Sequence, residues 1–130
     1  MRKYLWLIAA RTVAQPVWSI TVDEAITQYN PGGKQAFNTA HGEELWRRKN
    51  IGDDGKERDC MTCHGKDLSR PGKHVKTGKV IDPLAPSANK ERFTDMEKIE
   101  KWFKRNCKWT YGRECTDQEK GDLLKYLSTL

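Results

Sequence analysis

No stretch of this 130-residue sequence is apolar over the roughly 20 residues that a membrane-spanning helix requires. The apolar run near the N-terminus, residues 4–10, is much shorter. Internal repeats and low-complexity tracts are also absent. The sequence therefore predicts neither a membrane span nor a repeat array, and a chain of this length is expected to form one domain.

Excess positive charge is small once the N-terminus is set aside. The whole chain has 24 basic and 18 acidic residues, but residues 1–19 contain three basic residues and no acidic one. The remainder has 21 basic and 18 acidic residues, a net charge of +3 in place of +6. A near-neutral surface of mixed charge does not favour a nucleic-acid partner. A basic patch such as residues 47–49 is interpreted as a solvated face or, more weakly, as a surface that steers an acidic redox partner.

The N-terminus has the pattern of an export signal. Arg2 and Lys3 form a positive start, residues 4–10 form a short apolar segment, and residues 17–19 are suited to cleavage. We therefore predict a signal peptide over residues 1–19, a mature domain over 20–130 and a periplasmic location. The alternative is a short N-terminal helix that remains on the protein.

Residues 60–64 read Cys-Met-Thr-Cys-His, the attachment signature of a c-type haem. The thiols of Cys60 and Cys63 can add to the two vinyl groups of one porphyrin, and His64 can then ligate the iron. Only three residues in the chain are histidine, so one directly after C-x-x-C rarely arises by chance. The motif predicts one covalent haem c whose redox chemistry the protein tunes.

Two other kinds of site use the same cysteine spacing. A thioredoxin-like dithiol needs alternating strands and helices around it, and no run of strands surrounds residue 60. A structural zinc module would use Cys60, Cys63, Cys107 and Cys115. The zinc interpretation gives His64 no role and does not suit an exported chain, but it stays as an alternative.

The two remaining cysteines are expected in an oxidising compartment, where disulfides persist. Cys107 and Cys115 can pair with each other and would close a loop of about nine residues, worth about 2–3 kcal/mol in the chain-entropy description. The alternative is a pair of free, buried thiols.

Helix signals occur along most of the chain. Thr21, Thr94 and Thr116 each begin a T-x-x-E capping box, and further helical patterns cover residues 37–49 and 117–129. Gly42 can allow close approach of a neighbouring helix. Residues 65–93 are rich in Gly, Pro, Lys and Ser, which predicts a long ordered loop. A loop of this length is expected to wrap around another group, for which a haem edge is the candidate.

The helix predicted over residues 95–106 carries the candidates for the second iron ligand. Asn106 falls on the same side as apolar residues, at the expected helix end, and is either a C-terminal cap or a group facing the iron. Met96 on the same stripe and His74 in the long loop are the alternatives, and either would make an ordinary electron carrier.

Several segments together are similar to one family. They are residues 60–64, 77–87, 92–95, 102–107, 112–116 and 119–122. This combination resembles the sphaeroides haem protein family of class I-type monohaem cytochromes c, which is related to cytochrome c-double-prime. The similarity covers most of residues 33–130. It implies an all-α, class I-like cytochrome c fold of four to five helices around one covalent haem, with N-terminal and C-terminal helices packed together.

The resemblance also implies roles for individual residues. Cys60 and Cys63 would form the thioethers, His64 would be the proximal ligand, and Cys107 and Cys115 would form the family disulfide. Asn106 matches the distal position, where the family's asparagine binds ferric iron and leaves on reduction. An amide oxygen is a hard, neutral ligand, so a preference for Fe(III) over Fe(II) is chemically coherent.

The function implied is an exported electron-transfer protein that binds oxygen or nitric oxide at ferrous iron when Asn106 dissociates. The family's association with a multihaem cytochrome c and a membrane cytochrome b makes these the expected redox partners. We expect an electron carrier or oxygen-binding haem protein rather than an enzyme.

Overall fold

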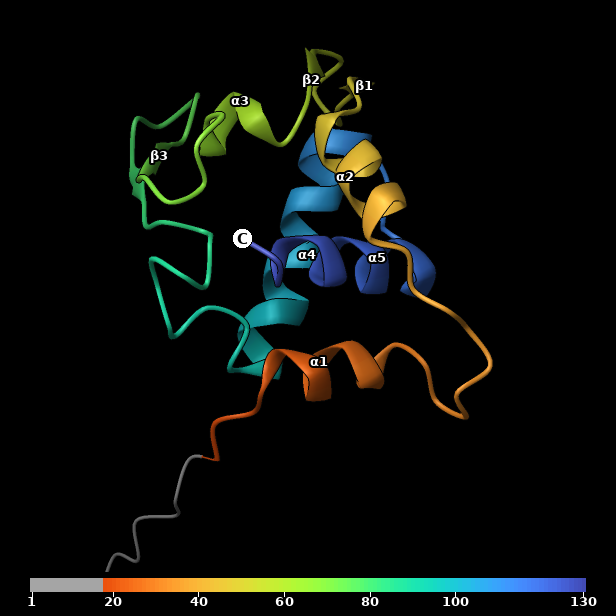
Figure 1. The fold of residues 1–130 in the computed structure, drawn as a ribbon. Coiled ribbons are helices and arrows are strands. Elements are labelled where there is room, and N and C mark those ends of the chain that lie inside the picture. The colour runs from red at the N-terminus through yellow and green to blue at the C-terminus, as the bar shows by residue number, and fades with distance from the viewer. Residues whose placement is uncertain (1–17) are drawn as a thin grey trace, which may run out of the picture.

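The computed structural model describes residues 18–130, which form five α-helices and two antiparallel strand pairs (Figure 1). The helices are α1 Val22–Gln28, α2 Thr39–Arg47, α3 Met61–His64, α4 Met96–Tyr111 and α5 Asp117–Leu127. Strand β1 Asn50–Ile51 pairs with β2 Glu57–Arg58, and β3 Gly72–Lys73 pairs with β4 Val80–Ile81. The strands have two residues each, so the predicted all-α class is confirmed.

The predicted export signal lies outside the described residues, apart from its last two positions. None of the helices within residues 18–130 combines the length and the apolarity needed to span a bilayer.

Two of the three predicted capping boxes are present. The hydroxyls of Thr21 and Thr116 each accept from the N3 amide, and the N3 glutamate accepts from the cap amide in return. The prediction at Thr94 was wrong by one residue. The Thr94 hydroxyl donates instead to the Glu91 carbonyl, and the Asp95 carboxylate caps α4 by accepting from Lys98 N.

Helix α4 is longer than predicted. It continues past Asn106 to Tyr111 and ends at Gly112, whose φ of 69° is the left-handed conformation that favours glycine at a helix end. Asn106 therefore lies inside the helix and is not its C-terminal cap, which corrects that interpretation.

Helix α5 lies against both α1 and α2, more extensively against α2, as expected for the two ends of the chain. The contact with α2 is close because Gly42 has no side chain. A Cβ at Gly42 would lie 2.0 Å from the carbonyl oxygen of Asp122. Leu123, Leu124 and Leu127 of α5 are buried and form much of the core.

The predicted long loop, residues 65–93, is largely irregular, with β3 and β4 as its only strands. It is fixed to the core at a few points. Leu68, Leu84 and Phe93 are buried, and the Leu68 carbonyl accepts from the amide of Leu84 at 3.0 Å. Figure 1 shows this segment, green to teal, arching from α3 past β3 to the start of α4.

Candidate haem site

The Cys-Met-Thr-Cys-His motif forms the single helical turn α3. Asp59 and Thr62 fix its start, because the Asp59 carboxylate accepts from Thr62 N at 2.8 Å while Thr62 Oγ1 accepts from Asp59 N at 3.2 Å. Gly65 ends the turn with φ of 76°. Cys60 and Cys63 are three residues apart, so their free thiols lie on the same side of this turn.

The chain that follows the motif crosses directly over it. A Cβ at Gly72 would lie 2.4 Å from the Cys63 carbonyl oxygen and 2.9 Å from His64 Cα, so only glycine fits there. The amide of Val75 then donates to Cys63 Sγ at 3.5 Å. These contacts hold the thiol of Cys63 and the backbone of His64 in place.

His64 is suited to metal ligation at neutral pH. Burial of its imidazole and, secondarily, the nearby charge of Arg92 lower its pKa to about 4, so the ring is neutral and keeps a free lone pair. Its ring centroid lies 5.3 Å from that of Trp46 on α2. Burial likewise raises the pKa of the Cys60 thiol to about 12, so Cys60 is a neutral thiol.

The donor set fits a covalent haem. Two free thiols and a neutral imidazole are held within five consecutive residues, with both thiols on one side of a helical turn. Haem c requires this set, two thioether-forming thiols followed by an axial histidine.

One side of α4 faces the segment that follows the motif. Trp102, Asn106 and Trp109 occupy positions i, i+4 and i+7 of the helix and therefore share a side. The guanidinium carbon of Arg92 lies 4.6 Å from the Trp102 ring centroid, and the His74 ring lies 5.4 Å from the Trp109 ring. Asn106 thus lies between two indoles that both contact residues 65–93.

The side chain of Asn106 is exposed, and within residues 18–130 it takes part in no hydrogen bond. Ile99 is 2% exposed on nearly the same side of the helix, but the protein atoms that cover Ile99 do not extend to Asn106. The amide is left accessible between Trp102 and Trp109.

The two alternative iron ligands both contact neighbouring protein groups. Met96, in the first turn of α4, packs against the hydrophobic core. His74 Nδ1 accepts from the amides of Lys76 and Thr77, at 3.2 Å each.

Cys107 and Cys115 form a disulfide with a Cα–Cα distance of 5.7 Å, the pairing that the family resemblance implied. It joins α4 to the segment that leads into α5, and both residues are buried. Because two of the four thiols are used here, the structure does not support the zinc alternative. Within residues 18–130, no group of three or more potential ligands is arranged to hold a metal ion.

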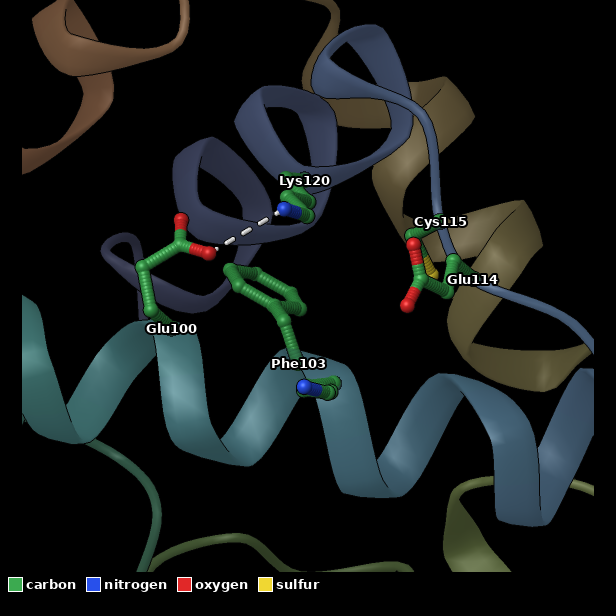
Figure 2. Close-up of a pocket in the computed structure, with 6 residues that line it drawn as sticks. Glu100, Phe103, Glu114, Cys115 and Lys120 are labelled. Atoms are coloured by element: carbon green, nitrogen blue, oxygen red, sulfur yellow. Dashed lines mark hydrogen bonds and ion pairs between the residues drawn. The ribbon is translucent and has the colours of Figure 1, made fainter.

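A small cavity lies beside this disulfide, on the side of α4 that carries Phe103 (Figure 2). It is lined by Glu100, Phe103, Lys104, Glu114, Cys115 and Lys120. Lys120 Nζ and a Glu100 carboxylate oxygen, 3.3 Å apart, form an ion pair across it. None of the predicted haem residues lines this cavity, so it belongs to the packing between α4 and α5.

Two residues that the sequence did not single out hold the site together. The guanidinium of Arg92 donates to the carbonyls of Pro83 and Asp82, at 2.8 and 2.7 Å, and so fixes the loop next to His64. The hydroxyl of Tyr111 donates to the Leu45 carbonyl at 2.9 Å and lies 4.0 Å from Cys60 Sγ. Arg92 occurs within a segment that resembles the family, but nothing in the sequence indicated either contact.

His41 of α2 forms part of the contact between α2 and α5. Asp122 is 1% exposed, and its carboxylate lies 2.6 Å from His41 Nδ1. It also accepts from the Asn38 amide at 2.6 Å and from Gln118 Nε2 at 3.0 Å. The buried carboxylate is thereby fully paired.

Comparison with known proteins gives a consistent result. Residues 32–127 match a family described as a domain of unknown function, DUF1924. The chain is 38% identical over 125 residues to the cytochrome c-type protein SHP of Cereibacter sphaeroides, covering 95% of this chain and 96% of that protein. It is 38% identical over 95 residues to cytochrome c'' of Methylophilus methylotrophus, covering 73% and 66% of the respective chains.

Solved structures agree with these relatives. The structure of oxidized SHP, described as an oxygen-binding cytochrome c, superposes with a TM-score of 0.78 at 38% identity and covers 86% of this chain and 99% of that one. Oxidized cytochrome c'' from Methylophilus methylotrophus gives a TM-score of 0.70 at 34% identity, covering 83% and 93%. The class I-like cytochrome c fold is confirmed, and so is covalent haem c as the cofactor.

Proposed function

The chain belongs to the family of c-type cytochromes that contains SHP and cytochrome c'', and on that premise we propose that it transfers electrons and binds a small diatomic ligand. The relative that guides this proposal is SHP, whose structure is described as that of an oxygen-binding cytochrome c. For this chain we propose oxygen or nitric oxide as the ligand.

We assign the haem contacts to three residues of α3 and its cap. Cys60 and Cys63 would form the thioethers, and the neutral imidazole of His64 would be the proximal ligand. The bound haem supplies one-electron chemistry and the iron position at which a diatomic ligand binds. Tyr111 and Arg92 support this arrangement, since Tyr111 lies beside Cys60 and Arg92 fixes the loop near His64.

Asn106 would be the distal ligand, and the observation that carries this proposal is its position on α4. Its accessible amide lies on the same side as Trp102 and Trp109, which both contact the segment following the haem motif. The amide oxygen is a weak, hard ligand that would hold ferric iron and release ferrous iron. Reduction would then open the site to the diatomic ligand.

The electron partners in this proposal are a multihaem cytochrome c and a membrane cytochrome b, which the family resemblance implies. Export to the periplasm is part of the same proposal, because the Cys107–Cys115 disulfide suits an oxidising compartment.

Stopped-flow mixing of the anaerobically reduced protein with oxygen or nitric oxide tests the ligand-binding function. We expect a rapid spectral change that saturates with ligand concentration. A plain electron carrier, the alternative with Met96 or His74 on the iron, would show only slow oxidation without a saturating phase.

A further inference from the structure

Positive charge is concentrated in one short segment beside the haem motif. Residues 65–80 contain five basic residues and one acidic residue, a net charge of +4. The rest of residues 18–130 contains 16 basic and 17 acidic residues, a net charge of −1. The small positive charge of the described chain therefore lies in this segment rather than being spread evenly over the surface.

The basic side chains of this segment are exposed and largely free. Lys66, Arg70, Lys73, Lys76 and Lys79 are all exposed. Only Arg70 has an acidic partner among the described residues, since its Nε lies 3.5 Å from an Asp67 carboxylate oxygen. The four lysines thus present uncompensated charge to the solvent.

Two exposed apolar side chains lie among these lysines. Val75 is 58% exposed and Val80 is 66% exposed, and both belong to the β3–β4 hairpin. Lys73 is the cross-strand partner of Val80, and the turn between the strands is closed by the His74 amide donating to the Lys79 carbonyl at 2.8 Å. An apolar centre with a charged rim is the usual composition of a protein–protein contact surface.

The same hairpin contacts the site of haem attachment. The Val75 amide donates to Cys63 Sγ, the atom proposed to carry a thioether, at 3.5 Å. On its other side the hairpin contacts α4, where the His74 ring lies 5.4 Å from the Trp109 ring and Lys76 Nζ lies 5.6 Å from it. A protein bound at Val75 would therefore lie close to the proposed thioether sulfur, because the Val75 amide is hydrogen-bonded to that atom.

From this placement we propose that the β3–β4 hairpin, residues 72–81, is the docking surface for an acidic one-electron redox protein. The inference rests on the proposed redox function and specifies the partner's chemistry. The lysine charges steer the acidic protein to the hairpin, and Val75 and Val80 form the dry centre of the contact. One electron would pass from the reduced partner to the haem that this chain binds, and no covalent bond would form or break.

Reduced flavodoxin, an acidic one-electron carrier, is a suitable probe. The double variant Lys73→Glu/Lys76→Glu is compared with Lys34→Glu. Lys34 is exposed, forms no ion pair with another residue of the range 18–130, and lies in the α1–α2 connection, on the opposite side of the molecule from β3 (Figure 1). At low salt we expect the double variant to lower the second-order reduction rate about tenfold and to weaken its salt dependence. Lys34→Glu should change the rate less than twofold, and reduction by neutral hydroquinone should be equal in all three proteins.

A second experiment is independent of electron transfer. Calorimetric titration with oxidised flavodoxin should show weaker binding for Val75→Ser/Val80→Ser at both low and high salt, because an apolar contact is insensitive to ionic strength. Equal losses in the Lys34→Glu and hairpin variants would overturn the proposal. A different pattern would also overturn it. If the wild type binds phosphatidylserine vesicles, and the hairpin variants lose this binding but are reduced by flavodoxin at the wild-type rate, the surface binds anionic lipid and not a redox protein. If the protein fails to bind oxygen but the hairpin variants give the expected flavodoxin results, only the proposed ligand-binding function is refuted.

Discussion

Ile99 and Asn106 lie on nearly the same side of α4, yet Ile99 is 2% exposed and Asn106 is exposed. Seven residues of an α-helix return to within about 20° of the starting direction. The difference therefore comes from what covers each residue and not from the direction in which it points. The cover over Ile99 is protein, whereas Asn106 is accessible between Trp102 and Trp109, where we place the open side of the iron.

Replacing Asn106 with alanine should keep the haem attached but change the ferric absorption spectrum and spin state. The physical reason is that the substitution removes the amide oxygen proposed as the sixth ligand, which would weaken the ligand field on Fe(III). Lys104→Ala is the matched control, since Lys104 is exposed on the same helix and lines the cavity on its other side. An unaltered ferric spectrum in Asn106→Ala would show that another group is the ligand.

Removing the disulfide should affect both stability and ligand binding. The double variant Cys107→Ser/Cys115→Ser is expected to lose about 2–3 kcal/mol of unfolding free energy, because the cross-link constrains the unfolded chain. The disulfide also begins one residue after Asn106, so its loss should alter the ligand association rate and the midpoint potential. If the association rate and the midpoint potential stay at their wild-type values while stability falls, the disulfide stabilises the fold but does not restrain the segment that carries Asn106.

Tyr111→Phe should destabilise the protein by about 1–2 kcal/mol, because the substitution removes the donor that satisfies the carbonyl of Leu45. Urea unfolding measures the loss. Tyr126→Phe is the control, since the hydroxyl of this buried tyrosine makes no hydrogen bond to another residue in the range 18–130. Similar losses in the two variants would mean that the Tyr111–Leu45 bond contributes little beyond ring packing.

Gly42→Ala should be among the most damaging single changes in the chain. The added Cβ would lie 2.0 Å from the Asp122 carbonyl oxygen, so α2 and α5 must separate, at a cost of about 3 kcal/mol. Ala40→Ser, at an exposed position of the same helix, should cost far less. Thermal unfolding of both variants checks the prediction, and a loss below about 1 kcal/mol for Gly42→Ala would show that the two helices are not held at this distance.

Local sequence signals predicted the parts of the fold that depend on neighbouring residues. The motif ending in His64 forms one helical turn, and the boxes at Thr21 and Thr116 cap their helices, because each pattern is completed within five residues. The same signal failed at Thr94, where Asp95 offers a competing cap one residue later. Gly112 marked the true end of α4, but the sequence alone did not favour it over an end near Asn106.

Contacts between distant residues were not predictable. His41 and Asp122 are 81 positions apart, and Tyr111 and Leu45 are 66 apart. No periodicity or spacing connects such pairs, since they depend on how α2, α4 and α5 cross. The accessibility of Asn106 was not predictable for the same reason, because it depends on how far along α4 the residues that cover Ile99 extend.

The most direct test of a site gated by Asn106 is the absorption spectrum of the dithionite-reduced protein before and after addition of carbon monoxide. If the amide leaves the iron on reduction, the ferrous spectrum should be high-spin and should change at once with carbon monoxide. A low-spin ferrous spectrum that carbon monoxide does not alter would contradict this prediction and would indicate a permanently occupied sixth position.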